Sequence, residues 1–263
     1  MSYDNYNHEY RRNGLHESAQ LYSASNLWTP TEDQKHMLGM EFSTNDGRTF
    51  RYCQNGGTAL AKNILVQSEA EAAGLVDELQ TAYGVSAGEK VFDVLVTTGN
   101  GISNGDLVDG YLLVNQGTAA TDEGDLYIIK DNKWTTSDTV LQIEIADEGG
   151  VRNAIAATSN ITILKNRYRD VIVKPTALTA EVVGATTSIV AADYYFWAQT
   201  KGPASVLVDA SDTIVVGEPA GQPGTAGTAG AIGLVANDGT DPVYGTVMYA
   251  AAGADYALID LNI

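Results

Sequence analysis

The sequence predicts an all-β protein, an antiparallel β-sandwich or barrel with one short helix and an extended N-terminal arm. Short runs rich in β-branched and aromatic residues recur along the chain, and glycine-containing turns such as Gly99-Asn100-Gly101 and Asp147-Glu148-Gly149-Gly150 separate them. The connections between these runs are too short for crossover helices, which favours antiparallel pairing over repeated βαβ units.

Composition limits the functions that the chain can have. With 263 residues it is long enough to bury a large core without staples, and its single cysteine, Cys53, excludes an intramolecular disulfide and fits assembly in a reducing cytosol. Its 33 acids and 15 bases give a net charge of −18, so we expect no binding to nucleic acid or to anionic membranes. No apolar run approaches the ~18 residues of a membrane span.

Residues 1–36 are predicted to form an extended N-terminal arm, because they are polar and contain too few aliphatic residues for a core. They carry Tyr3, Tyr6, Tyr10 and Tyr22, and they lack the apolar centre of a signal peptide. One interpretation is a disordered leader, and the other is an arm whose tyrosines bind a neighbouring subunit. The three histidines are His8, His16 and His36, and their spacing matches no metal site.

Residues 37–263 are predicted to form a β-rich body. Its first hairpin joins Leu38–Phe42 to Arg48–Cys53 through Asp46-Gly47, a dipeptide that favours tight turns because glycine tolerates positive φ. Cys53 has no histidine near it in the sequence and is interpreted as a buried structural thiol.

One helix is predicted, over about residues 69–83. Ser68 and Glu71 match a capping box, and Gly84 supplies a left-handed stop. Between them, apolar residues recur at helical spacing, namely Ala72, Leu75, Val76, Leu79 and Tyr83.

Further strands are predicted after the helix, namely Val91–Thr97, Leu107–Asn115, Asp125–Lys130, Val140–Ala146 and Ile161–Leu164. The glycines at 99, 101 and 105 do not match the spacing of a nucleotide-binding loop, and no Gly-Lys-Ser/Thr occurs. The acidic groups around residues 122–125 and 238–241 lack the full pattern of a calcium loop and are interpreted as polar turns. We therefore predict no cofactor and no metal.

Four cations lie close together in the middle of this acidic chain. Lys165, Arg167 and Arg169 alternate, which would place them on one side of an extended segment, and Lys174 follows closely. One interpretation is a basic strand face that binds an acidic partner or the acidic end of a neighbouring copy. The other is a solvated strand face without a partner.

The segment Asp193–Val208 is predicted to be a buried hairpin in the middle of the sheet. Tyr194 to Trp197 place four large rings in a row, Lys201-Gly202-Pro203 suggests a turn, and Val206 to Val208 is apolar again. Short β-branched runs flank this segment on both sides, which makes it central. The body could divide into two parts near residue 202.

The C-terminal 62 residues, from Gly202 to Ile263, contain seven acids and no base, so this end is expected to face solvent or a positive partner. Within it, residues 217–233 have glycine at every third position from 221, which indicates an extended surface loop or a contact of three chains about a local axis. Three last strands follow, namely Ile232–Ala236, Val243–Ala250 and Tyr256–Leu261.

No catalytic residues are predicted. A hydrolase of the nucleophile–base type needs a histidine or another base beside its nucleophile, and all three histidines lie in or beside the polar arm. A glycosidase needs only two carboxylates across a cleft, so a carbohydrate-binding or hydrolysing module stays an alternative.

Four groups of residues carry a resemblance to a known class of protein. They are Leu38-Gly39 with Asp46–Tyr52 and Gly57–Leu60, Leu164–Asn166 with Val171–Pro175, Tyr194–Pro203, and Val243–Ala252. In order and spacing, over about Met37 to Ile263, they resemble structural proteins of tailed bacteriophages, and the nearest class is the capsid decoration, or cement, protein.

This resemblance implies a non-enzymatic virion protein that binds the outside of the phage head, stabilises it by bridging capsid subunits, and is assembled in the host cytoplasm. It implies the major capsid protein as a partner, together with other copies of this chain in a homotrimer or another multimer, and it supplies no active-site residues. The alternative within the same class is another virion component, such as a head-to-tail, tail or fibre-base protein.

Overall fold

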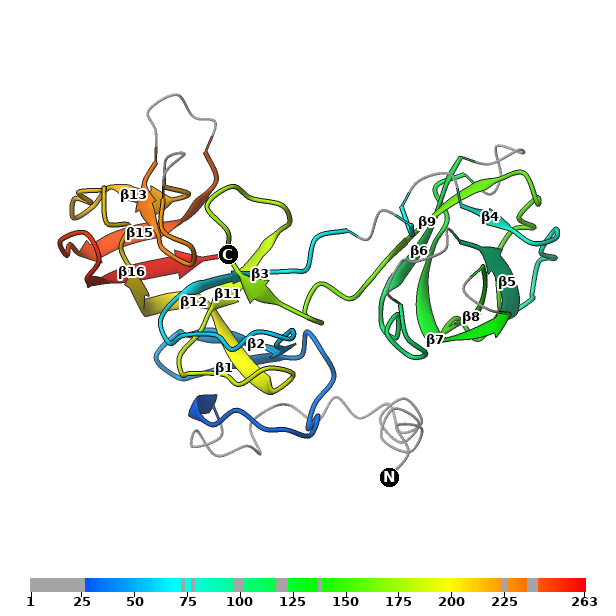
Figure 1. Ribbon diagram of the computed structural model, residues 1–263, viewed down its shortest axis with the longest axis horizontal. Helices are drawn as coiled ribbons and strands as arrows, with labels where there is room; N and C mark the ends of the chain where they lie inside the picture. The colour runs from blue at the N-terminus through cyan, green and yellow to red at the C-terminus, as the bar shows by residue number, and fades with distance from the viewer. Residues whose placement is uncertain are drawn as a thin grey trace. The chain divides into compact units, whose positions relative to one another are not determined.

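The computed structural model describes residues 27–71, 74–76, 79–96, 102–116, 123–136, 139–223, 227–235 and 241–263. The chain divides into two compact units (Figure 1). Unit 1 comprises Met1–Glu69 and Arg167–Ile263, and unit 2 comprises Ala70–Asn166, which the chain inserts between the two parts of unit 1. The boundaries therefore fall at 69/70 and 166/167, whereas Gly202, near which we expected a division, lies inside a strand.

The described residues contain sixteen strands in two antiparallel sheets, which confirms the all-β prediction. Unit 1 holds β1 (Glu41–Ser43), β2 (Thr49–Gln54), β3 (Leu65–Gln67), β10 (Ile172–Val173), β11 (Val182–Ala185), β12 (Tyr195–Leu207), β13 (Pro219–Gly221), β14 (Gly233–Leu234), β15 (Val243–Tyr249) and β16 (Tyr256–Asn262). Unit 2 holds β4 (Gln80–Thr81), β5 (Val91–Leu95), β6 (Tyr111–Gln116), β7 (Leu126–Thr136), β8 (Val140–Ile145) and β9 (Asn160–Leu164).

Strand β12 is the centre of the unit 1 sheet, whose order is β10-β3-β11-β12-β16-β15-β13-β14, with β1 and β2 attached through β12 (Figure 1). The central position is confirmed, but the predicted hairpin is wrong because β12 continues through Gly202. A bulge lies between Gln199 and Lys201, and Gly202 has a φ of 79°. The Gln199 Nε2 atom donates to the carbonyl oxygens of Lys201, Gly202 and Pro203 at 3.0–3.2 Å. The side-chain amide thus stabilises an irregular strand where we expected a turn.

The aromatic residues of β12 pack against the first hairpin. Strands β1 and β2 pair with Phe42 opposite Phe50, which confirms the predicted hairpin through Asp46-Gly47. Tyr52 of β2 stacks on Tyr195 at 5.9 Å between ring centroids and meets Trp197 edge-on at 5.1 Å. Each of these three rings is at most 5% exposed, so they form a dry aromatic cluster at one part of the sheet.

The sheet of unit 2 curls until its first and last strands meet. Its order is β4-β5-β8-β7-β6-β9, and Leu79, just before β4, forms a bridge with Ile161 of β9. The Ile161 amide donates to the Leu79 carbonyl oxygen at 2.8 Å. The barrel interior is filled by buried side chains that include Phe92, Tyr127 and Ile143. Small barrels are packed in this way, with no lumen for a ligand.

The helix predicted over about residues 69–83 is wrong where the structure describes this stretch. Residues 74–76 form a turn, and β4 follows, while residues 72–73 and 77–78 lie outside the described residues. The carbonyl oxygens of Leu75 and Leu79 accept hydrogen bonds from Ile163 and Ile161 of β9. Pairing with the barrel therefore overrides local helix propensity.

No helix among the described residues is long and apolar enough to cross a membrane.

Residues 220–223 and 230–233 of the glycine-rich segment are buried in unit 1, which corrects the expectation of an extended surface loop over residues 217–233, while residues 224–226 lie outside the described residues. It contains β13 and β14, which pair with each other. A Cβ atom on Gly230 would lie 2.8 Å from Ile64 Cβ, and one on Gly221 would overlap the carbonyl oxygen of Pro242. The glycines at these positions therefore allow close approach of the backbone to its neighbours.

Candidate functional site

The arm tyrosines Tyr3, Tyr6, Tyr10 and Tyr22 lie outside the described residues, as do His8 and His16. Their role in binding a neighbouring subunit stays a prediction. His36 is described, and it packs its ring against Tyr52 and Trp197 at centroid distances of 4.9 and 5.3 Å. Burial lowers its pKa, so the imidazole belongs to the aromatic cluster as a neutral ring.

The four predicted cations do not form one exposed strand face. Residues 165–170 follow β9 outside any strand, with turn and bend conformations at 167–170, so their alternation does not correspond to a strand. Arg169 is 8% exposed and Lys174 is fully buried. Arg167 donates to Glu181 at 3.0 Å and places its guanidinium 5.0 Å from the centre of the Tyr168 ring. The geometry of the predicted basic face is therefore wrong, and a role of Lys165 or Arg167 in binding a partner stays a prediction.

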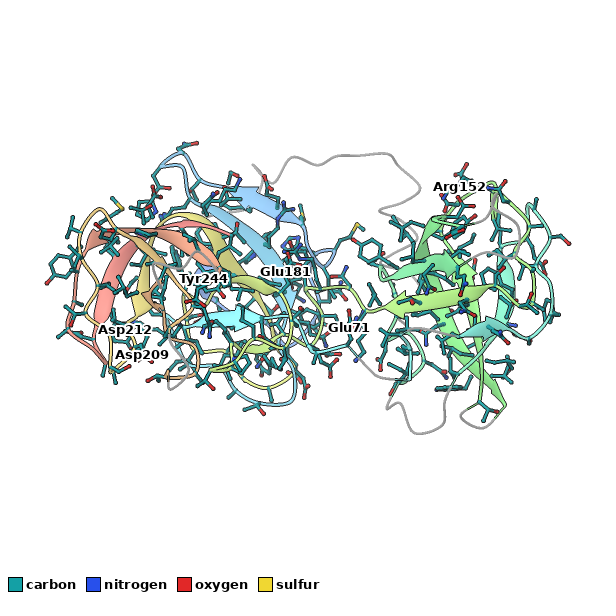
Figure 2. All side chains as sticks on the ribbon, turned by 90° about the horizontal axis from the view of Figure 1, so that it is seen from above. Glu71, Arg152, Glu181, Asp209, Asp212 and Tyr244 are labelled. Atoms are coloured by element: carbon teal, nitrogen blue, oxygen red, sulfur yellow. The ribbon has the colours of Figure 1, made fainter. Side chains whose placement is uncertain are left out.

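Lys174 lies at the centre of a buried polar cluster in unit 1. Its Nζ atom donates to Gln222 Oε1 at 2.9 Å, and the hydroxyl of Tyr244 donates to the same oxygen at 3.4 Å. Gln222 Nε2 donates in turn to the carbonyl oxygen of Thr176. Figure 2 labels Tyr244, Asp209 and Asp212 in this unit. The cluster connects the residues just after β10 and β13 to β15 through side chains, in addition to the backbone pairing of β13 with β15.

Burial shifts the pKa values of this cluster. It lowers the pKa of Lys174 to about 8, and the negative charge of Asp209 opposes this shift in part. It also raises the pKa of Tyr244 to about 12, and the charge of Asp241 contributes to this rise. Strongly shifted groups in a cleft are candidates for catalysis, but Lys174 is completely enclosed. The arrangement therefore fits a structural role better than a reaction.

Asp209 and Asp212 precede the glycine-rich segment and hold its second half by hydrogen bonds. Asp209 accepts hydrogen bonds from the backbone amides of Ser211 and Thr228, and Asp212 accepts one from the amide of Leu234 at 2.9 Å. Burial raises the pKa of Asp209, but its hydrogen bonds with Ser211 and Thr228 outweigh this effect and leave the pKa below its usual value. Both carboxylates are thus occupied by backbone donors, which is a structural use of acids.

Unit 2 has a polar cluster at Arg152, which Figure 2 labels. The guanidinium lies 4.7 Å from the centre of the Tyr127 ring and donates to Asp125 at 3.2 Å. Asp125 also accepts from the Tyr127 hydroxyl at 2.9 Å and from Asn153 at 3.0 Å. Burial raises the pKa of Asp125, whereas these hydrogen bonds lower it below its usual value. The cluster ties the loop after β8 to the start of β7 around the Tyr127 hydroxyl, so Asp125 makes more contacts than the polar turn that we predicted.

A groove of about 190 Å³ runs over the barrel surface of unit 2, and it is lined by Val91, Asp131, Asn132, Lys133, Gln142 and Glu144. Lys130 forms an ion pair with Glu144 beside it. No group of three or more histidine, cysteine or acidic side chains suited to a metal occurs among the residues that the structure describes. The two carboxylates that line the groove, Asp131 and Glu144, are neighbours across β7 and β8, and Glu144 is paired with Lys130.

Cys53 is fully buried, and burial raises the pKa of its thiol. The buried thiol was predicted, and its burial is confirmed. We expect a water-soluble disulfide reagent to modify Cys53 only as fast as unit 1 opens, because the thiolate is the reactive form and the folded structure disfavours it. Absorbance of the released thiolate, followed in buffer and in urea, measures both rates. Equal rates in buffer and in urea would contradict this prediction.

The outer surface of unit 1 carries an apolar patch, which we call the β15–β16 face. It consists of Val215, Val216, Met248, Tyr249, Tyr256 and Leu258, which are 37–63% exposed. Tyr249 lies directly opposite Leu258 in the sheet, and Tyr256 is two positions before Leu258 on the same face. The amide of Gly217 donates to Val247, which places Val215 and Val216 beside β15. Contiguous exposed patches of this kind commonly mark interaction surfaces.

Three features of these sites were not predicted from the sequence, namely the roles of Asp209 and Gln222 and the β15–β16 face. The alternation of β16, Tyr-Ala-Leu-Ile-Asp-Leu-Asn, did contain a signal for the face. In this strand apolar residues occupy both phases of the alternation, so one apolar set must face outward.

Comparisons with protein families, with curated proteins and with solved structures found no match to this chain.

Proposed function

We propose that this chain is a non-enzymatic virion structural protein, a capsid decoration protein that binds the outside of a tailed-phage head and stabilises it by bridging capsid subunits. The proposal combines the resemblance of residues 37–263 with the distribution of apolar groups in the structure. Its partners are the major capsid protein and other copies of the same chain, in a homotrimer or another homo-oligomer.

The observation that carries this proposal is the β15–β16 face. The interiors of both units are filled with side chains, whereas Met248 and Tyr249 of β15 and Tyr256 and Leu258 of β16 are exposed. A protein that acts through its surface has this distribution, because an exposed patch gains hydrophobic free energy only when a partner covers it. Repetition of such a modest contact over a lattice multiplies its effect.

The net charge of −18 supports a position on the outside of the head. A strongly acidic protein placed against packaged DNA would repel the phosphates, whereas on the outer surface its charges are solvated and screened. The β15–β16 face is one proposed contact with neighbouring subunits. The sequence adds others, namely Lys165, Arg167 and the tyrosines of the N-terminal arm.

The experiment that tests the proposal starts from purified particles of the phage whose genome encodes this chain. Quantitative mass spectrometry is expected to find the chain in a fixed ratio to the major capsid protein, and antibody–gold labelling is expected to decorate the heads. Labelling of tails alone would favour another virion component. Absence from the particles would overturn the proposal, and turnover or binding on a panel of glycans would then support the carbohydrate module.

A further inference from the structure

We propose that the β15–β16 face is the surface that docks on the partner, and that the partner presents an apolar patch surrounded by lysine and arginine side chains. This inference rests on the proposed function, in which the partner is a capsid subunit. It assigns the contact to one face of unit 1 and states the chemistry that the opposing surface must have.

The first argument is the sheet geometry. Strand β16 alternates, with Ala257, Ile259 and Leu261 in the unit 1 core and Tyr256, Leu258 and Asp260 on the outside. Its neighbours in the sheet are β15 on one side and β12 on the other (Figure 1). Tyr249 and Leu258 form a cross-strand pair on the outer side, and such pairs bury area together when a partner covers them.

The second argument is the kind of side chain exposed. Tyr249 is 63% and Tyr256 is 47% exposed, and the bulge between Val247 and Tyr249 adds Met248 to the exposed residues, at 47%. Tyrosine and methionine are enriched at the centres of protein interfaces, because both bury a large apolar area and adapt to a partner. A sheet face that needed only solubility would carry lysine or threonine at these positions.

The third argument is the charge around the face. Glu218, Asp255 and Asp260 border it, and they are exposed and form no ion pair with any residue that the structure describes. The nearest cation in the sheet is Lys201, which pairs with Asn262, four residues along β16 from Leu258. Lys62 is the other nearby cation, next to the Asn63 that donates to Ser205 opposite Leu258. Three acids against two lysines leave a net acidic rim, which attracts a basic surface.

The same charges exclude a second copy docked face to face. A two-fold contact between two β15–β16 faces would place the three acids of one copy near the three acids of the other. Like charges brought together at an interface cost free energy and slow association. The partner therefore differs from this face, and complementarity requires cations around its apolar centre.

Unit 2 provides a matched control surface. Ile128 and Leu126 of β7 are 47% and 48% exposed, and Tyr111 of β6 lies opposite Ile128. The neighbouring charges are mixed, because Lys130 forms an ion pair with Glu144 and Arg152 forms one with Asp125. This surface has comparable exposed apolar groups but lacks the acidic rim. Variants of it therefore distinguish specific docking from nonspecific hydrophobic association.

The test uses particles of the same phage produced without this chain, and measures binding of the purified protein by sedimentation. The double variant Tyr249→Ser/Leu258→Ser is expected to bind at least about tenfold more weakly than the wild type, as loss of central interface side chains does. The double variant Leu126→Ser/Ile128→Ser is expected to bind like the wild type. Both changes affect exposed side chains, and unchanged thermal melting by circular dichroism confirms that each variant is folded.

Charge reversal tests the chemistry of the partner. The variant Glu218→Lys/Asp260→Lys is expected to bind the particles more weakly, and its affinity is expected to fall much less than that of the wild type as the salt concentration rises. The variant Glu148→Lys in unit 2 is expected to keep the wild-type affinity and the wild-type salt dependence. Wild-type-like binding of both β15–β16 variants, or equal loss with the unit 2 variant, would overturn this inference and leave the proposed function intact. Failure of the wild type to bind these particles would overturn both.

Discussion

Replacing Gly150 by alanine is expected to lower the free energy of unfolding of unit 2 by about 3 kcal/mol. Gly150 has a φ of 73°, a left-handed conformation that costs roughly 1–2 kcal/mol for a residue with a Cβ atom. The new Cβ would also overlap the carbonyl group of Gly88, and overpacking adds roughly 1–3 kcal/mol. The backbone cannot withdraw easily, because Gly88 and Glu89 are both hydrogen-bonded to Val151.

The adjacent residue offers a stringent control. A Cβ atom on Gly149 would have no atom within 4 Å, and its φ is not positive, so Gly149→Ala is expected to leave the stability unchanged. Amide hydrogen exchange, read by mass spectrometry on peptides from β6 and β7, measures unit 2 separately from unit 1. Equal protection of the β6 and β7 amides from exchange in the two variants would contradict this prediction. It would show that the close contact of residues 88–89 with residues 150–151 does not stabilise the barrel.

The sequence predicted the strands best where pattern and tertiary contacts agree. The Asp46-Gly47 turn and the alternation of β8 and β16 are local signals, and the structure has strands at each of these places. The four rings before Gln199 correctly indicated the most central strand, because only a central strand can surround such large side chains with partners. Turn chemistry was less reliable, as Gly202 sits at a bulge and not at a hairpin.

The remaining errors have one physical origin, which is long-range pairing. The helical spacing of Leu75 and Leu79 was real, but β9 lies some 80 residues later in the chain and takes their carbonyl oxygens. Lys174 was expected on an exposed basic face, either solvated or bound to a partner, yet Gln222, about 50 residues away, supplies an acceptor inside unit 1. Sequence alone contains no measure of these distant partners.

The burial of Lys174 leads to the second large prediction, a rise in stability with pH. The lysine has a pKa of about 8 in the folded protein and 10.5 without burial. Between these two values the unfolded chain binds a proton that the folded chain does not, so stability increases as the pH rises. Below pH 8 both states are protonated, and the folded state bears the full cost of a buried charge. From pH 7 to pH 10 the expected gain from this group is roughly 2–3 kcal/mol.

Lys174→Met isolates this contribution, because methionine has a similar length and no charge. The difference in unfolding free energy between the wild type and this variant is expected to shift in favour of the wild type by roughly 2–3 kcal/mol from pH 7 to pH 10. Urea unfolding followed by tryptophan fluorescence measures it, in a Trp134→Phe background that leaves only Trp28 and Trp197 of unit 1 as reporters.

The stability measurements end at pH 10 because ionisation of Tyr244 above this pH lowers the stability, whereas deprotonation of Lys174 raises it. Its folded pKa of about 12 lies above the ordinary value of 10, so above pH 10 the unfolded chain loses a proton that the folded chain keeps, and stability falls. Tyr244 is present in both proteins, and comparing wild type with variant therefore removes most of its effect. Parallel pH profiles of the two proteins would mean that Lys174 keeps its ordinary pKa in the folded protein and has access to water, which would contradict the closed cluster with Gln222.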